Sequence, residues 1–176
     1  MRDGGIILYP TDTIWGIGCD ATSEDAVKRV YELKQRADSK AMLLLLDSAD
    51  KLPLYVTDVP DIAWNLIEVA DKPLTIIYPN AKNLAPELLA EDGSVGIRIT
   101  QEAFSKELCY RFRKPVVSTS ANISGQPSAP TFADVSDEIR NGVDYIVNYR
   151  QGDASKAKPS GIIKIDEQGH IQIIRE

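Results

Sequence analysis

Short apolar runs of strand length alternate along the chain with segments in which apolar residues recur at helical spacing. This alternation predicts an α/β protein in which helices pack against a sheet. The longest unbroken apolar run covers residues 41–46 and is far shorter than a membrane span, so we expect no membrane segment. Strands are expected at residues 5–9, 42–46, 74–78, 95–100, 116–120, 145–148, 161–165 and 171–174.

The clearest helical pattern covers residues 58–71. Its apolar residues lie three or four positions apart and form one face, made of Val59, Ile62, Ala63, Leu66, Ile67 and Ala70. Asp58 is expected to cap this helix, with Pro60 in the first turn, where a missing N–H is tolerated.

Two further helices are expected at residues 23–36 and 101–112. Thr22 and Asp25 resemble a capping box at the start of the first. The inward-facing residues are Ala26, Val30 and Leu33 in the first helix and Phe104, Leu108 and Cys109 in the second. Residues 167–170 form a turn-like tetrapeptide and predict a hairpin between the last two strands.

Composition narrows the class of protein. A chain of 176 residues with 43% apolar and 26% charged residues fits one globular domain with a proper core. The net charge of −6 argues against broad nucleic-acid binding, but it leaves room for a small cationic pocket. Cys19 and Cys109 form neither a disulfide framework nor a metal site, and no leader opens the chain, so a cytoplasmic protein is expected.

Residues 9–18 follow the first strand and are rich in hydroxyls and glycine. Thr11 and Thr13 offer two hydroxyls, and Gly16 and Gly18 permit a ligand to approach the backbone closely. Because α/β proteins build sites in loops at strand ends, this segment is a candidate binding loop. The alternative is a structural turn around a buried tryptophan.

Residues 34–40 lie at the end of the helix expected at residues 23–36 and carry several cations. Lys34 and Arg36 are candidates for a phosphate clamp, with arginine as a planar fork and lysine as a point charge. The alternative is structural, because cations near a helix C-terminus also interact favourably with the helix dipole.

Residues 118–131 leave a strand and carry several hydroxyls and an amide. Ser118, Ser120 and Asn122 alternate, so an extended backbone would direct all three side chains to one side. We therefore expect the polar rim of a binding site here. An ordinary loop rich in serine and proline is the alternative.

Arg98 is the most informative single residue. In the strand at residues 95–100, Val95, Ile97 and Ile99 are expected on the buried face, whereas Arg98 shares the other face with Ser94 and Gly96. A guanidinium with space around it favours a carboxylate or phosphate partner. The alternative is pairing with a neighbouring acid on an open face.

Several catalytic signatures are missing from the sequence. It contains neither a Gly-x-x-x-x-Gly-Lys-Ser/Thr loop nor a complete dinucleotide fingerprint. The one histidine, His170, falls in the predicted hairpin turn, so a serine or cysteine nucleophile activated by histidine is not expected. Chemistry that depends on positioning and charge stabilisation, such as phosphoryl or nucleotidyl transfer, fits better.

Five segments carry a family signature, in order and across nearly the whole chain. They are Tyr-Pro-Thr-Asp-Thr-Ile-Trp-Gly-Ile-Gly at 9–18, Lys-Gln-Arg at 34–36, Pro-Leu-Thr at 73–75, Val-Gly-Ile-Arg at 95–98 and Ser-Ala-Asn-Ile-Ser-Gly at 120–125. Together they resemble the YrdC-type threonylcarbamoyl-AMP synthases. Each segment alone is moderately specific, and five in register are a strong signal.

The resemblance implies a twisted mixed sheet of parallel and antiparallel strands, flanked by helices, in one domain over residues 1–176. Its concave face is expected to hold the ligands. By position, Lys34 and Arg36 are expected to be catalytic. The residues implied for threonine are Thr13, Arg98, Ser120 and Ser160, and those for ATP are Arg36, Lys40, Ser94, Ser118, Asn122, Thr131 and Arg175.

The chain also departs from the family pattern. Alanines replace two usual prolines, Lys40 replaces a frequent asparagine, and Leu45 replaces a histidine of some members. The segment 158–161 lacks the usual Ser-Thr pair, which weakens the transfer to Ser160. The first strand begins almost at once, so an N-terminal helix is expected to be missing.

The reaction implied by the resemblance forms threonylcarbamoyl-AMP and pyrophosphate from L-threonine, bicarbonate and ATP, with magnesium. It precedes threonylcarbamoyladenosine formation in tRNA, which makes tRNA or tRNA-modification proteins expected partners. One alternative is a non-catalytic factor that binds double-stranded RNA or assists ribosome assembly. Another is carbamoyl-adenylate chemistry from carbamoyl phosphate, which elsewhere comes with zinc-binding and acylphosphatase-like segments that this sequence lacks.

Overall fold

The computed structural model describes residues 1–35, 42–154 and 159–176. The strands are β1 Ile7–Tyr9, β2 Gly16–Gly18, β3 Leu43–Leu46, β4 Leu74–Tyr78, β5 Val95–Ile99, β6 Val116–Ser120, β7 Tyr145–Ile146, β8 Gly161–Ile165 and β9 Ile171–Arg175. The α-helices are α1 Glu24–Leu33, α2 Asp61–Val69, α3 Ala103–Phe112 and α4 Asp137–Gly142. Short 3₁₀ helices are η1 Ala49–Leu54, η2 Pro86–Leu88 and η3 Phe132–Asp134.

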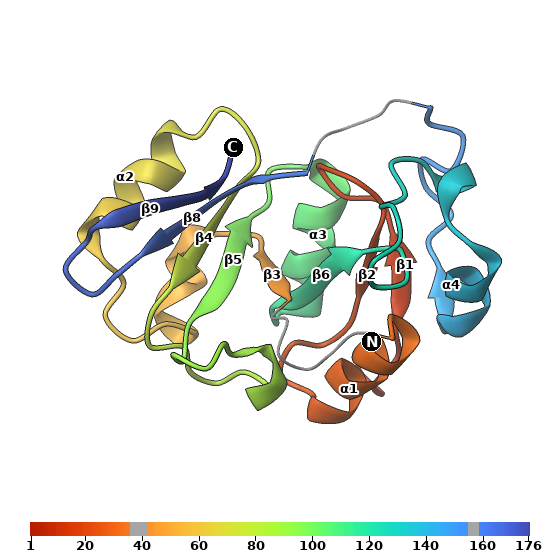
Figure 1. Ribbon diagram of the computed structural model, residues 1–176, viewed down its shortest axis with the longest axis horizontal. Coiled ribbons are helices and arrows are strands. Elements are labelled where there is room, and N and C mark those ends of the chain that lie inside the picture. The colour runs from red at the N-terminus through yellow and green to blue at the C-terminus, as the bar shows by residue number, and fades with distance from the viewer. Residues whose placement is uncertain (36–41, 155–158) are drawn as a thin grey trace.

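The nine strands form one sheet in the order β7-β1-β2-β6-β3-β5-β4-β8-β9 (Figure 1). The pairs β1–β7, β3–β5 and β4–β8 are parallel, and the remaining neighbours are antiparallel. The expected mixed sheet is therefore confirmed. Every strand predicted from the sequence is present, with bounds that differ by a few residues at most.

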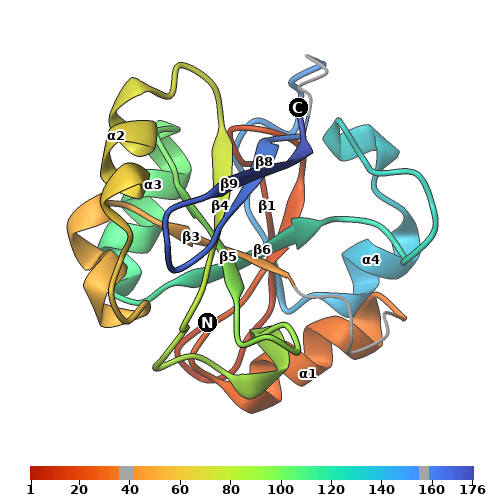
Figure 2. The same cartoon turned by 60° about the vertical axis from the view of Figure 1, so that its left-hand side comes forward.

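Helices α2 and α3 lie together on one side of the sheet, away from α4 (Figure 2). The strand residues that face α2 include Ile76 and Ile97, each at most 2% exposed. Burial of such side chains contributes about 1.5–3 kcal/mol each to folding. The opposite face of β4 and β5 remains available for polar side chains. In the described part of the chain, none of the helices has the length and apolar character needed to cross a membrane.

The predicted helix caps are wrong by one residue or more. Helix α1 is capped by Ser23, whose hydroxyl accepts from the Ala26 N–H, while the Thr22 hydroxyl donates to Asp20 Oδ1 at 2.6 Å. Helix α2 begins at Asp61, three residues after the predicted start. Pro60 occupies its N-cap position and makes no side-chain hydrogen bond there. Asp58, the predicted cap, has a left-handed backbone (φ 49°) outside the helix.

The apolar helix faces are largely as predicted. Ala26 and Val30 of α1 and Cys109 of α3 are fully buried. The side chain of Glu102 caps α3 by accepting from the Ser105 N–H at 2.7 Å. Ala70 is the exception, because α2 ends at Val69 and leaves Ala70 exposed.

Besides the three short 3₁₀ helices, one strand and one α-helix were not predicted. Strand β2 lies inside the segment expected to be a loop, and helix α4 escaped notice because its six residues carry little periodicity. Gly18 was expected to let a ligand approach the backbone closely, and the structure corrects this expectation. A Cβ at Gly18 would lie 2.7 Å from Tyr9 Cε1, so this glycine permits close packing within the sheet.

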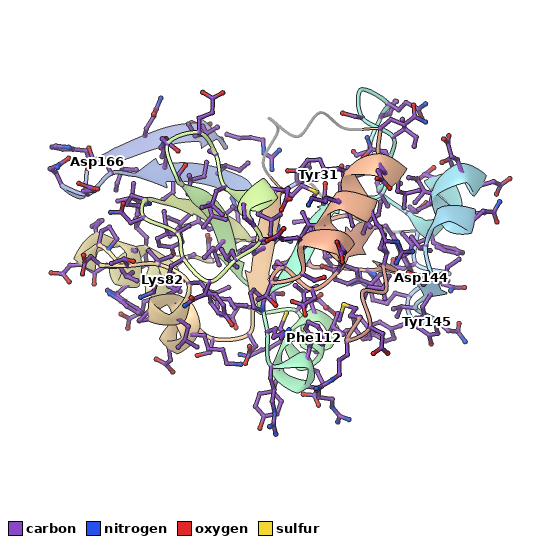
Figure 3. All side chains as sticks on the ribbon, turned by 90° about the horizontal axis from the view of Figure 1, so that it is seen from below. Tyr31, Lys82, Phe112, Asp144, Tyr145 and Asp166 are labelled. Carbon is purple, nitrogen blue, oxygen red and sulfur yellow. The ribbon has the colours of Figure 1, made fainter. Side chains whose placement is uncertain are left out.

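The hairpin between β8 and β9 is confirmed. Its turn contains Gly169 with φ 83°, a backbone conformation that favours glycine. Figure 3 places Asp166 at one end of the molecule, opposite Asp144 and Tyr145. His170 pairs with Asp166 at 2.7 Å and its side chain is 79% exposed, so the histidine lies on the surface as expected.

Candidate active site

A cavity of about 520 Å³ opens on the face of the sheet opposite α2. Its walls come from the β1–β2 loop and from strands in the middle of the sheet, so segments far apart in the sequence meet here. The predicted site residues that line it are Thr13, Ser94, Arg98, Ser118, Ser120, Asn122, Ser160 and Arg175.

Strand register accounts for the position of Arg98. Strand β5 lies between β3 and β4, where Arg98 is opposite Leu45 on one side and Thr75 on the other. Ser94, Gly96 and Arg98 line the cavity. Ile97 and Ile99 line a second cavity of about 130 Å³ under α2, which confirms the predicted division of the strand for these residues. Val95 was predicted to share their face, but it is buried and lines the large cavity.

Arg98 is buried in an environment that leaves hydrogen-bonding capacity unused. Its side chain is 2% exposed, and Nη2 lies 2.9 Å from Asp12 Oδ1. The ion pair lacks hydrogen-bond geometry, because Asp12 Oδ1 and Arg98 Nε are both buried without a hydrogen-bond partner in the described residues. The guanidinium therefore retains donors for an anionic group at the cavity.

Burial governs the electrostatics of this pair. It lowers the pKa of Arg98, and the carboxylate of Asp12 opposes the shift. It also raises the pKa of Asp12, and the charge of Arg98 opposes that shift in turn. The sequence left open that Arg98 pairs with an acid on an open face. Arg98 does pair with an acid, Asp12, but the arginine side chain is buried.

A second guanidinium lies near the first. Arg98 and Arg175 both line the cavity, and burial lowers the pKa of Arg98 with a smaller contribution from the positive charge of Arg175. Arg175 Nε donates to the backbone oxygen of Ser160 at 2.9 Å. The Ser160 hydroxyl in turn lies 2.9 Å from Thr75 Oγ1. Two cations beside hydroxyls are suited to bind an anionic, hydroxylated ligand.

The loop between β1 and β2 supplies the threonine hydroxyls. Thr11 Oγ1 donates to the Ile14 carbonyl at 2.8 Å and accepts from the Thr13 N–H at 3.1 Å. Arg150 Nη1 donates to the Thr11 carbonyl at 3.1 Å and so anchors the loop from outside. Trp15 is 4% exposed and lines the cavity, so the buried tryptophan and the binding loop are features of one segment.

Lys34 does not line the cavity, in contrast to its predicted catalytic position. Its side chain is 1% exposed, and Nζ donates to the backbone oxygens of Ser120 and Asn122 at 2.5 and 2.7 Å. The Lys34 carbonyl also accepts from the Ser124 N–H at 2.8 Å. In this structure the lysine therefore ties the end of α1 to the loop after β6.

Asn122 is held in a defined orientation. Its Nδ2 donates to the carbonyls of Ile123 and Gln126 at 2.9 and 2.8 Å. Its Oδ1 is buried without a hydrogen-bond partner in the described residues, and the residue lines the cavity. A buried acceptor without a donor is costly, so this oxygen is suited to accept from a ligand N–H or O–H.

Ser94 is held in a similar way. Its hydroxyl donates to Asp92 Oδ1 at 2.6 Å, which leaves the oxygen lone pairs of Ser94 for a donor in the cavity. Lys164 also bonds to Asp92, and these contacts lower the pKa of Asp92 to about 2.

Besides Lys34, one described residue of the predicted site, Thr131, is not brought to the cavity. Thr131 begins η3, where its hydroxyl donates to Asp134 Oδ2 at 2.6 Å, and it does not line the cavity. Arg36 and Lys40 lie outside the described residues.

Sequence reasoning did not assign several polar residues at this site, among them Thr75, Gln126 and Asp12. Thr75 and Gln126 line the cavity, and Asp12 pairs with Arg98. For Thr75 a signal was present, because it is a polar residue inside an apolar strand. Asp12 lies in the candidate binding loop at residues 9–18, but nothing in the local sequence indicates that it pairs with Arg98.

The described residues contain no group of three or more histidine, cysteine, aspartate or glutamate side chains that could hold a metal ion. The cavity donors are instead hydroxyls, amides and guanidinium groups. Hard cations prefer carboxylate ligands, so this donor set does not fit a magnesium ion held by the described residues alone.

The family model Sua5_yciO_yrdC, described as telomere recombination, matches residues 1–176. The chain belongs to this family. A relative named threonylcarbamoyl-AMP synthase, from Pseudoalteromonas translucida (strain TAC 125), is 33% identical over 92% of this chain and 87% of its own length.

Solved structures of the Sua5/YciO/YrdC family have the same fold. P. abyssi Sua5 in complex with L-threonine has a TM-score of 0.83 at 24% identity, covering 93% of this chain. The match spans 48% of the P. abyssi chain, so this chain corresponds to about half of that protein. E. coli YciO has a TM-score of 0.83 at 24% identity, covering 99% of this chain and 84% of that chain.

Proposed function

We propose that this chain is a threonylcarbamoyl-AMP synthase, a nucleotidyltransferase that joins L-threonine, bicarbonate and ATP and releases pyrophosphate. Relatives with that name match it over most of their length. The observation that carries the proposal is the buried guanidinium of Arg98, which faces a cavity lined with hydroxyls and retains unused donors. The relatives' name favours this enzyme over a non-catalytic RNA-binding factor.

In the proposed reaction, protonated bicarbonate loses water and gives carbon dioxide. The neutral amine of threonine forms a C–N bond to this carbon and loses a proton, which gives the carbamate. A carbamate oxygen then attacks the α-phosphorus of ATP. The new O–P bond forms as the bond to the β-phosphate oxygen breaks, and pyrophosphate leaves with that electron pair. Arg98 would hold the threonine carboxylate, and binding in the cavity would limit the contact of the carbamate with water.

Magnesium enters this proposal as part of the MgATP substrate, bound to the phosphates. The chain's own contribution is to orient the nucleotide. The unpartnered Oδ1 of Asn122 and the lone pairs of Ser94 are suited to accept from donors of the adenosine. Arg36 and Lys40 stay predicted ATP contacts.

The product would pass to the tRNA-modification proteins that make threonylcarbamoyladenosine, in the cytoplasm. This part of the proposal depends on the relatives' name. It implies that the chain releases or hands over a reactive acyl-adenylate, so a tRNA or protein acceptor belongs to the complete pathway.

The decisive assay measures pyrophosphate release with MgATP and bicarbonate. We expect release with L-threonine, much less with L-serine and none without an amino acid. Equal release in all three reactions would identify a general ATPase and contradict the proposal. RNA retention that weakens with added salt, without any pyrophosphate release, would favour the RNA-binding alternative.

A further inference from the structure

Thr75 is a polar residue in the middle of an apolar strand. Strand β4 has the sequence Leu-Thr-Ile-Ile-Tyr and is paired on both sides, with β5 and β8. Thr75 is 1% exposed and faces the cavity, whereas Leu74 and Ile76 face the second cavity under α2. A buried hydroxyl is costly unless it makes hydrogen bonds, so its surroundings indicate why it is present.

The hydrogen-bond partner of Thr75 is another buried hydroxyl. Thr75 Oγ1 lies 2.9 Å from Ser160 Oγ, and Ser160 is 3% exposed. Each hydroxyl has one hydrogen to donate and two lone pairs, and a bond between them uses only one of the two hydrogens. The pair therefore retains one donor and several lone pairs at the wall of the cavity.

The hydroxyl pair lies next to the expected carboxylate site. Thr75 and Arg98 are register partners across β4 and β5, so their backbones are adjacent. Ser160, the other hydroxyl of the pair, is held by Arg175, whose Nε donates to the Ser160 carbonyl. In an α-amino acid, the β-carbon is two bonds from the carboxylate carbon. A ligand whose carboxylate is bound by Arg98 would thus present its β-substituents near Thr75.

Gly96 leaves room beside this pair. It lines the cavity between Ser94 and Arg98, and a Cβ placed on it would lie 3.4 Å from Thr75 Cγ2. The wall therefore offers a methyl group and two hydroxyls beside an open space. A β-carbon that carries both a hydroxyl and a methyl group matches this surface in polarity.

We propose that the hydroxyl pair of Thr75 and Ser160 binds the side-chain hydroxyl of the amino acid held by Arg98, and thereby selects threonine over its apolar isostere valine. This role for Thr75 rests on the proposed synthase function and adds a specificity-determining residue to it. A site that pairs with a substrate hydroxyl discriminates strongly against an analogue that lacks it, because its own polar groups are then left unpaired.

The test compares kcat/KM for threonine and for valine in the pyrophosphate-release assay. Thr75→Val keeps the shape of the side chain and removes its hydroxyl. We expect the threonine-to-valine ratio to fall roughly 10- to 100-fold, the effect of losing one buried hydrogen bond and its unpaired partner. Thr75→Ser retains the hydroxyl and serves as the matched control, with a ratio within about threefold of wild type.

Ser160→Ala removes the other hydroxyl with a minimal change in volume, so it tests the pair even when Thr75→Val folds poorly. It is expected to lower the same ratio. Unchanged ratios in Thr75→Val and Ser160→Ala, with an active wild-type enzyme, would overturn this inference alone. A wild-type protein that releases no pyrophosphate with threonine would overturn the synthase proposal itself.

Discussion

The cavity has two sides that are built in different ways. On the side of β4, β5 and β8, the positions of Thr75 and Arg98 follow from strand register, and Ser160 directly precedes β8. On the side of the β1–β2 loop and the loop after β6, side chains anchor the backbone from a distance. Lys34 binds the carbonyls of Ser120 and Asn122, and Arg150 binds that of Thr11.

This difference has a physical consequence. A strand residue is fixed by many backbone hydrogen bonds, so its placement resists the loss of any one side chain. A loop carbonyl held by one ammonium or guanidinium depends on that single group. We therefore expect substitutions in the sheet wall to act on ligand binding, and substitutions of the loop anchors to act on local order as well.

The largest expected effect is at Arg98. Arg98→Lys keeps a positive charge but loses the planar fork that can bind a carboxylate in a bidentate way. We expect kcat/KM for threonine to fall roughly 1,000-fold, equivalent to about 4 kcal/mol. Arg29→Lys is a matched control, because Arg29 lies on the surface with a side chain that is 43% exposed. Equal activity of both variants would remove Arg98 from the binding site.

The second effect is at Lys34. Lys34→Met keeps an unbranched side chain but removes two charge-assisted hydrogen bonds, each worth about 1.5–3 kcal/mol. We expect a lower melting temperature together with a roughly 10- to 100-fold loss of activity, because the loop after β6 loses its anchor. Lys28→Met, a surface change on the same helix, is the control. A loss of kcat at an unchanged melting temperature would instead indicate direct contact with the nucleotide.

A smaller effect concerns Asp92, which orients Ser94 at the edge of the sheet wall. The Lys164 ammonium, with the Ser94 hydroxyl, lowers the pKa of Asp92 to about 2 from 3.8. The carboxylate therefore stabilises the fold above about pH 4, and this contribution is lost as the pH falls toward 2. The melting temperature of wild type should exceed that of Asp92→Asn at pH 6, and the difference should vanish near pH 2. A difference that does not change with pH would rule out this titration.

The smallest effect is expected at His170. This residue pairs with Asp166 in the exposed β8–β9 turn and lies outside the cavity. His170→Ala should leave kcat/KM within about twofold and change stability by less than about 0.5 kcal/mol. A large loss of activity would show that the hairpin takes part in the reaction and that the site extends beyond the two walls.

The same contrast explains what could be predicted from the sequence. Alternation in residues 95–100 identified the face that carries Arg98, because a strand repeats every two residues. Ser118, Ser120 and Asn122 were predicted to share one side for the same reason, and all three line the cavity. The Arg98–Asp12 pair was not predicted, since nothing in a local pattern connects residues from two separate segments.

Errors arose where local chemistry offered two equivalent solutions. Thr22 and Ser23 are both good helix caps, and the structure uses Ser23 while Thr22 bonds to Asp20. Gly18 was assigned to ligand contact because a glycine in a hydroxyl-rich loop permits it, but the ring of Tyr9 occupies the adjacent space. The phosphate contact of Lys34 stays a prediction, because its buried ammonium bonds to loop carbonyls in this structure.

The ion pair between Arg98 and Asp12 joins two residues that line different cavities. Asp12 lines the small cavity under α2, whereas Arg98 lines the large one. The carboxylate that neighbours the guanidinium is therefore within reach of the small cavity. A basic group placed beneath α2 would compete with Arg98 for that carboxylate, so a change made in the small cavity would act on the large one.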